Sequence, residues 1–145
     1  MRVMLTSQFG HGHWRPLAGL AGVLSEAGHD VAFVSTPATC EALRRHGFEC
    51  FPAGIDDMGG VDPERVDGDA KRLDPAEAVW RHVFAGRRVH EMLPEMLEAA
   101  RAWGPDLIVR EITEFSGMLV ADLLDVPFAT LQISAWRPQT QAVLE

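Results

Sequence analysis

The sequence predicts an α/β fold, a Rossmann-like doubly wound parallel sheet with helices on both faces. Two observations indicate it. Short apolar segments alternate with helical patterns at the pace of successive βαβ units. The second segment, Ala32-Phe33-Val34, is apolar at every position, which is typical of a strand covered on both faces. With 145 residues the chain is long enough for one domain with a substantial core.

The first third of the chain gives the clearest elements. Gly28 and Gly47 supply the stop signals that end two helical patterns, and Thr36-Pro37 supplies the start of the second. The predicted elements are a strand over 3–6, a helix over 15–27, a strand over 31–35, a helix over 37–46 and a strand over 48–51.

Residues 52–75 interrupt this rhythm with repeated glycine and proline. They predict a long mobile loop, either a surface loop without a role or a segment that covers a ligand. The remaining predicted elements are a long helix over 76–103 that Gly86 and Pro94 kink or divide, a strand over 106–109, a helix over 115–124 and a strand over 127–131.

The composition excludes several classes of function. A net charge of −8, without a stripe of basic residues, argues against nucleic acid and against an anionic membrane surface. No apolar run approaches the roughly 18–20 residues that span a bilayer, and the first residues lack a signal-peptide pattern, so we expect a cytoplasmic protein. Cys40 and Cys50 have no metal-binding spacing, and we expect two free, buried thiols.

The loop Phe9-Gly10-His11-Gly12-His13-Trp14-Arg15-Pro16 is the most informative stretch. Its glycines allow a sharp turn, and Pro16 suits the first turn of the helix that follows. His13 is therefore expected just ahead of a helix, at the carboxyl end of the first strand, where open α/β sheets bind ligands. An imidazole at that place can act as a base near neutral pH.

Two acids follow the fourth predicted strand, and the same sheet edge should bring them near His13. A carboxylate against an imidazole fixes its tautomer and stabilises the imidazolium, so His13 with Glu111 suits removal of a proton from a substrate hydroxyl. Simpler interpretations stay open: His13 as a loop histidine bonded to the backbone, and Glu111 as a solvated acid at a strand end.

Two other interpretations of the glycine-rich loop fit less well. A dinucleotide fingerprint requires a third glycine where this chain has Arg15, and an acid where it has Ser35-Thr36. A zinc site built on His11 and His13 lacks further ligands at a recognisable spacing. We therefore expect no metal and no cofactor.

Aromatic residues near the ligand edge have two possible roles. Trp80 and Phe84 lie four residues apart on one helical face beside the long loop, as core residues or as an apolar wall for a large, flat ligand. Trp136 follows the fifth strand on the same edge and is a candidate pocket residue.

The residues Val-Met-Leu-Thr-Ser…Gly-His-Gly-His-Trp-Arg-Pro-Leu, then Leu-Ser-Glu-Ala-Gly-His-Asp-Val, resemble the amino-terminal domain of GT-B glycosyltransferases. The nearest group is the actinobacterial one that decorates macrolides, aromatic polyketides and enediynes in antibiotic biosynthesis. The resemblance implies an inverting transferase in which His13 deprotonates the acceptor hydroxyl and Glu111 is its partner. Many members of the family have aspartate at the second position. The implied acceptor-binding residues are Gly12, Trp14, Trp80, Phe84, Glu114, Phe115 and Trp136.

The resemblance also implies that 1–145 is an acceptor-binding half, cut short, and that a nucleotide sugar (dTDP- or UDP-linked) binds a carboxy-terminal domain absent here. Three alternatives stay open. The chain could be a non-catalytic aglycone-binding module or a Rossmann-like nucleotide-binding domain. It could also be a packing unit whose strand edge meets another chain, such as a second copy in a homo-oligomer.

Overall fold

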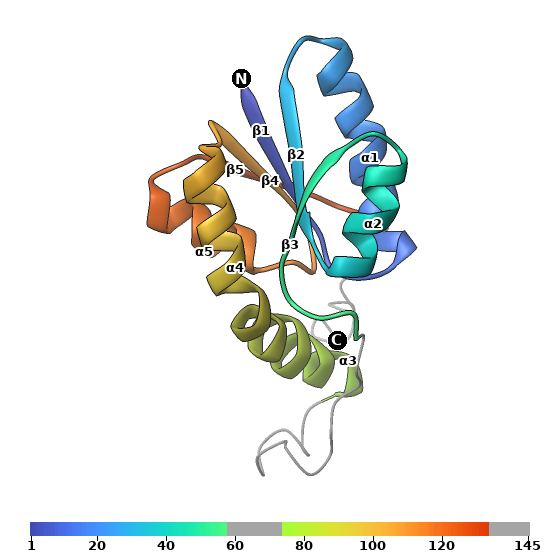
Figure 1. Ribbon diagram of the computed structural model, residues 1–145. Helices are drawn as coiled ribbons and strands as arrows, with labels where there is room; N and C mark the ends of the chain where they lie inside the picture. The colour runs from blue at the N-terminus through green and yellow to red at the C-terminus, as the bar shows by residue number, and fades with distance from the viewer. Residues whose placement is uncertain (58–73, 134–145) are drawn as a thin grey trace, which may run out of the picture.

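The computed structural model describes residues 1–57 and 74–133, which form a five-stranded sheet with helices on both faces (Figure 1). The strand order is β3-β2-β1-β4-β5, and every neighbouring pair is parallel. This confirms the predicted doubly wound α/β fold. The strands are β1 (Arg2–Thr6), β2 (Asp30–Ser35), β3 (Glu49–Pro52), β4 (Leu107–Glu111) and β5 (Phe128–Leu131).

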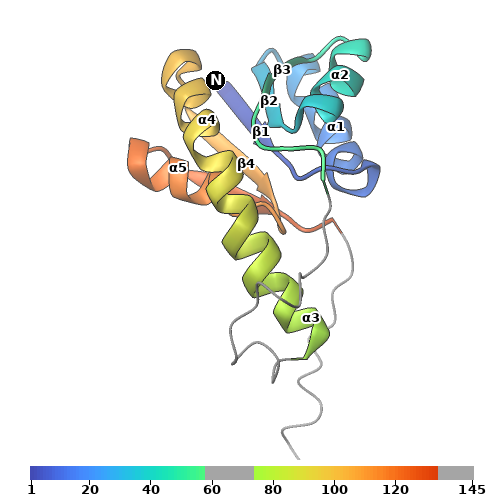
Figure 2. The same cartoon turned by 60° about the horizontal axis from the view of Figure 1, so that its bottom comes forward.

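Alternation along β1 divides the core between the two faces of the sheet. Val3 and Leu5 are buried with Leu17 of α1 (His11–Glu26), whereas Met4 is buried with Met92 of α4 (Arg88–Trp103). Helices α1 and α2 (Pro37–Arg45) cover the first face, and α4 and α5 (Ser116–Leu124) cover the second (Figure 2). Each large apolar side chain buried in this way contributes about 1.5–3 kcal/mol.

Helix α1 begins four residues earlier than predicted, directly after Gly10. Gly10 has φ 111°, a conformation that only glycine adopts readily, and its carbonyl accepts hydrogen bonds from the N–H groups of His13 and Trp14. His13 therefore lies inside the first turn of the helix rather than ahead of it. Pro16 lies within α1 rather than at its start.

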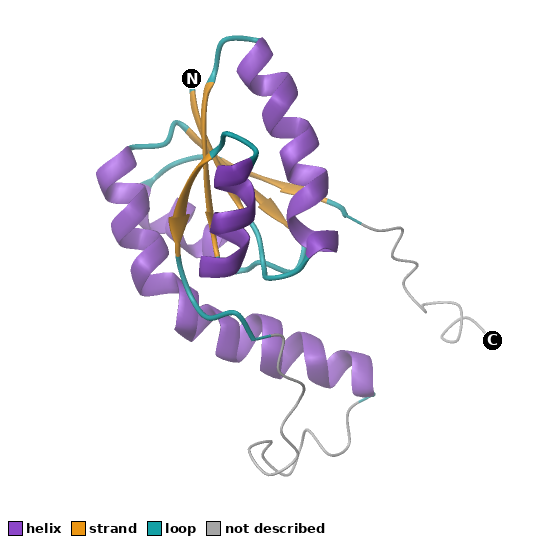
Figure 3. Cartoon of the chain, turned by 45° about the vertical axis from the view of Figure 1, so that its right-hand side comes forward, coloured by secondary structure: helices purple, strands orange, loops and turns teal. Residues whose placement is uncertain are grey.

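The long helix after residue 74 is continuous but not uniform. It runs through α3 (Pro75–Ala78), a π-helical segment η2 (Val79–Arg87) and α4, and Figure 3 shows the three as one bent rod. Pro94 is accommodated inside α4. Gly104, with φ 67°, ends the helix by donating its N–H to the carbonyl of Ala100.

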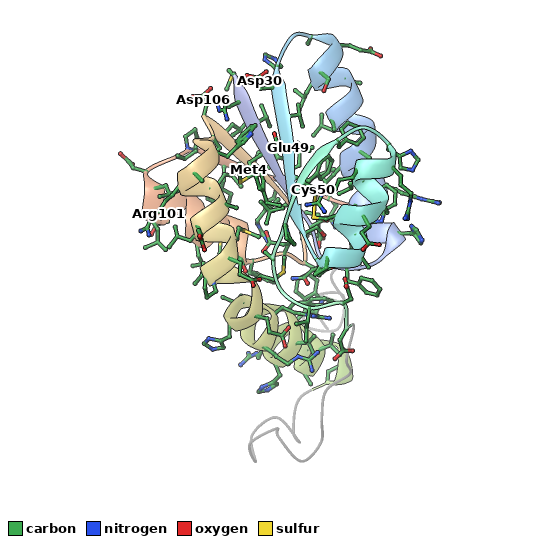
Figure 4. The ribbon with its side chains drawn as sticks, viewed as in Figure 1. Met4, Asp30, Glu49, Cys50, Arg101 and Asp106 are labelled. Atoms are coloured by element: carbon green, nitrogen blue, oxygen red, sulfur yellow. A yellow bond between two sulfur atoms is a disulfide. The ribbon has the colours of Figure 1, made fainter. Side chains whose placement is uncertain are left out.

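Cys40 of α2 and Cys50 of β3 form a disulfide, seen as a yellow bond beside Cys50 in Figure 4. The expectation of two free thiols was wrong. The turn between α2 and β3 is short, so β3 runs back beneath α2. That path brings the two Cα atoms to 5.2 Å, within the range that a disulfide requires.

The residues after β3 are hydrogen-bonded to helices α2 and α4. The N–H of Gly54 donates to Glu95 of α4 at 2.7 Å, and the buried Arg88 donates to the carbonyl of Ile55 at 3.1 Å. The carboxylate of Asp56 accepts from the N–H of Ala38 in the first turn of α2, where an anion is favoured by the helix dipole. Most of the predicted mobile loop, residues 58–73, lies outside the described residues.

Candidate active site

The carboxyl ends of β1 and β4 lie side by side because the two strands pair in parallel, Thr6 opposite Arg110. Val109 is buried in the cluster beneath α1, and side chains alternate along a strand. Glu111, two residues later, therefore points to the same face, toward the first turn of α1. Arg110 points to the opposite face, toward α4 and α5.

The structure brings His13 and Glu111 into contact. The imidazole Nδ1 lies 3.1 Å from Oε1 of Glu111. The His13 side chain is 17% exposed and that of Glu111 is fully buried, so the imidazole lies between the carboxylate and solvent. Glu111 is the last residue of β4, whereas the predicted strand ended two residues before it.

Thr113 joins this pair and was missed in the sequence. Its hydroxyl oxygen lies 3.2 Å from Nδ1 of His13 and donates a short hydrogen bond to Oε1 of Glu111. Its N–H donates to Oε2 of Glu111 at 2.8 Å. The local signal is a hydroxyl residue two positions after an acid at a strand end, a spacing that lets a side chain bond the following backbone.

The hydrogen-bond partners decide which imidazole nitrogen can act as a base. A carboxylate is an acceptor, so Nδ1 of His13 carries the proton and donates it to Glu111. The N–H of Gln8 adds a further donor to Glu111 at 3.4 Å, which helps to compensate the burial of this carboxylate. Nε2 of His13 then has its lone pair free, because no described residue hydrogen-bonds it.

Glu114 does not lie where the sequence predicted. It is fully buried, accepts from the hydroxyl of Thr6 at 2.5 Å, and accepts from the N–H groups of Ser116 and Gly117 at the start of α5. Burial raises the pKa of Glu114, and the nearby Glu111 raises it further, against the lowering effect of these donors. Glu114 links β1 to α5 and presents nothing to a ligand.

The structure also places Trp14, a predicted acceptor-binding residue, in the core. Its side chain is 5% exposed and belongs to the core cluster beneath α1, with its ring 6.0 Å from that of His46. Adjacent residues on a helix point about 100° apart, so the turn that presents His13 to the cleft directs Trp14 inward. Gly12 is exposed in the same turn, and nothing lies within 4 Å of the place where its Cβ would be.

Three predicted aromatic residues form a continuous series beside His13. The ring of Phe84 lies 6.5 Å from the imidazole of His13, Trp80 lies 5.7 Å from Phe84, and Trp80 meets Phe115 edge-on at 5.9 Å. All three are half-buried, as expected of a wall rather than of a core. Trp136 lies outside the described residues.

A pocket of about 310 Å³ opens at the end of this series, a size suited to a small organic ligand. Trp80, Ile112 and Phe115 line it together with Arg110, which the sequence analysis did not single out. Trp80 connects the pocket to His13 through Phe84, whose ring lies between them in the series.

Within residues 1–57 and 74–133, no helix combines the length and the apolar character that a membrane span requires. No group of three or more histidine, cysteine or acidic side chains there is arranged to hold a metal ion.

No family model matches the chain, but individual proteins do. It is 28% identical over 158 aligned residues to the 10-deoxymethynolide desosaminyltransferase of Streptomyces venezuelae, with 95% of this chain covered. It is 33% identical over 132 residues to the L-demethylnoviosyl transferase of Streptomyces niveus, with 88% covered. Among solved structures, the glycosyltransferase SsfS6 of Streptomyces sp. SF2575, complexed with thymidine diphosphate, superposes with a TM-score of 0.80 at 28% identity and 96% coverage. The chain thus matches natural-product glycosyltransferases of GT-B fold over one part of their length.

The chain matches only part of each relative. It spans 36% of the S. venezuelae enzyme, 33% of the S. niveus enzyme and 40% of the SsfS6 chain. Its 145 residues thus fit one half of the two-domain GT-B architecture.

Proposed function

We propose that this chain is the acceptor-binding half of an inverting glycosyltransferase that acts on a hydroxyl group of a natural-product aglycone. The observation that carries the proposal is the contact of 3.1 Å between Nδ1 of His13 and Oε1 of Glu111, which leaves Nε2 available, with the ring of Phe84 6.5 Å from the imidazole. The S. venezuelae and S. niveus relatives are named as sugar transferases, and SsfS6 binds thymidine diphosphate. These names support a dTDP-linked sugar as the donor, held by a domain outside this chain.

The transfer follows from this geometry. Nε2 of His13 takes the proton of the acceptor hydroxyl while Glu111 stabilises the imidazolium through Nδ1–H. The acceptor oxygen forms a bond to the anomeric carbon from the side opposite the nucleotide. The bond between that carbon and the phosphate oxygen breaks, and the nucleoside diphosphate leaves with the electron pair. The configuration at the anomeric carbon is therefore inverted.

Replacing the base tests the proposal. In a complete transferase that contains this chain, His13→Ala should lower kcat by about 10²–10⁴-fold, the usual contribution of a general base. His90→Ala, on the exposed face of α4, is the matched control and should leave kcat unchanged. Full activity of the His13 variant would remove His13 from the mechanism, and a product of retained anomeric configuration would exclude inversion.

A further inference from the structure

The pocket lined by Trp80, Ile112 and Phe115 contains a cation, Arg110, whose charge no group among the described residues neutralises. Arg110 is 8% exposed, and its hydrogen bonds go to the hydroxyl of Thr130 and to the backbone carbonyls of Ile112 and Glu114. None of these acceptors carries a charge. In the part of the chain that the structure describes, no carboxylate lies within 4.0 Å of the Arg110 guanidinium.

The two acids nearest in sequence are bonded elsewhere. Glu111 accepts from His13, Thr113 and Gln8 on the opposite face of β4. Glu114 accepts from the hydroxyl of Thr6 and from two N–H groups at the start of α5. Burial raises the pKa of Glu114, so this carboxyl holds its proton more readily and compensates the charge of Arg110 less.

Hydrogen bonds fix the Arg110 guanidinium through Nε and Nη1 and leave Nη2 without an acceptor among the described residues. Nε donates to Thr130 at 3.1 Å, and Nη1 donates to Ile112 at 3.1 Å and to Glu114 at 2.6 Å. The Cζ atom lies 5.0 Å from the centre of the Phe115 ring, a cation–π arrangement that fixes the plane further. Arginine has five N–H donors. The two on Nη2 meet no acceptor among the described residues.

We propose that this pocket binds the aromatic ring of an acceptor that carries an anionic oxygen, a carboxylate or an ionised phenol, and that Nη2 of Arg110 is the donor that selects it. Trp80, Phe115 and Ile112 provide the apolar walls, and aromatic rings pack against such walls edge-on or offset. A charge-assisted hydrogen bond between apolar walls is stronger than one between neutral groups. This inference rests on the proposed function, since it names the class of acceptor that His13 would deprotonate.

Matched probes test this on the whole chain by calorimetric titration, without a sugar donor. 2-Naphthoate should bind at least about tenfold more tightly than 2-naphthylmethanol, the scale of a hydrogen bond to a charged group. 2-Naphthylmethylammonium should bind more weakly than either. To test an ionised phenol, 7-hydroxycoumarin at a pH where its phenol is ionised should bind more tightly than 7-methoxycoumarin. An anion preference in either pair supports the proposal, and no preference in both pairs overturns it.

Variants assign the preference to the guanidinium. Arg110→Met should bring the affinities for 2-naphthoate and 2-naphthylmethanol to within about twofold of each other, whereas Arg45→Met, on the exposed end of α2, should preserve the difference. An Arg110→Met chain that keeps the preference overturns the assignment. If that variant does not fold, the probe series on the unaltered chain decides alone, because it compares charges at constant shape.

The two proposals fail in different ways. His13-dependent transfer to neutral acceptors as fast as to anionic ones would overturn the role of Arg110 and leave the transferase function intact. Tight anion binding with unchanged turnover in His13→Ala would do the reverse.

Discussion

The hydroxyl of Thr113 contacts both members of the His13–Glu111 pair. It donates to Oε1 of Glu111, and its oxygen lies 3.2 Å from Nδ1 of His13. Nδ1–H is thereby shared between the Glu111 carboxylate and the Thr113 oxygen. Thr113 does not reach Nε2, so its effect on proton transfer passes through the orientation and charge of its two partners, and we regard it as a positioning residue.

Thr113→Val removes this hydroxyl at nearly constant volume. We expect kcat of the complete transferase to fall by about 10- to 100-fold, because a hydrogen bond to a charged group is typically worth about 1.5–3 kcal/mol. Thr39→Val in α2 removes a buried hydroxyl that bonds only Thr36 and should leave kcat unchanged. A Thr113 variant with the kcat of the control would show that the hydroxyl serves packing alone.

The residues of the site were predictable to different degrees, for physical reasons. His13 and Glu111 could be placed together because parallel strands converge at one edge. The inward direction of Trp14 and Glu114 was not predictable, because one residue along a helix turns a side chain by about 100° and the path of a turn decides where its side chains point. Arg110 gave no signal, since a single cation within a strand reveals neither its face nor its partners.

At the scale of elements, periodicity predicted the five strands of the described sheet and the succession of helices. It did not predict the residues at which the helices begin or the segment that is π-helical. Helix α1 starts at His11 because Gly10, with its positive φ, lets the chain turn directly into the helix. The π-helical segment η2 carries Trp80, Val83 and Phe84 at a spacing that reads as an ordinary helix. The bond between Cys40 and Cys50 depends on the tertiary path of the chain, which ten residues of separation do not reveal.

The turn after β3 offers a prediction about packing between elements. Gly54 and Gly28 have similar positive φ values, 76° and 82°, so alanine costs about 1–2 kcal/mol at either from backbone strain. A Cβ at Gly54 would lie 2.6 Å from Cγ of the fully buried Met92, whereas nothing lies within 4 Å at Gly28. Gly54→Ala should therefore lower the free energy of unfolding by about 1–3 kcal/mol more than Gly28→Ala.

Denaturant unfolding of the two glycine variants measures this difference directly. The backbone penalty is common to both and cancels, so the remainder reports how firmly the turn packs on α4. Equal losses of stability in the two variants would mean that Met92 moves aside freely.

At the scale of the whole molecule, the sheet edge that forms the candidate site also buries two carboxyl groups, one on each face of the sheet. Glu111 faces α1 and Glu114 faces α5, both without measurable exposure. Backbone N–H groups and hydroxyls compensate them, which is why one chain can hold two acids at one edge. The compensation is incomplete at Glu114, where burial outweighs the donors and raises the pKa above its ordinary value of 4.5.

This raised pKa couples Glu114 to the stability of the entire fold. Between the ordinary value of 4.5 and the raised value in the folded state, the folded chain binds more protons at Glu114 than the unfolded chain does. The free energy of unfolding must then fall as pH rises through that interval, and the contribution is constant above it. Glu114→Gln removes the titrating group at the same size. The stability of the unaltered chain minus that of the variant should decline with rising pH and then level off, as measured by denaturant unfolding at a series of pH values. A difference for Glu114→Gln that rises with pH would mean that the carboxylate is the form favoured by folding.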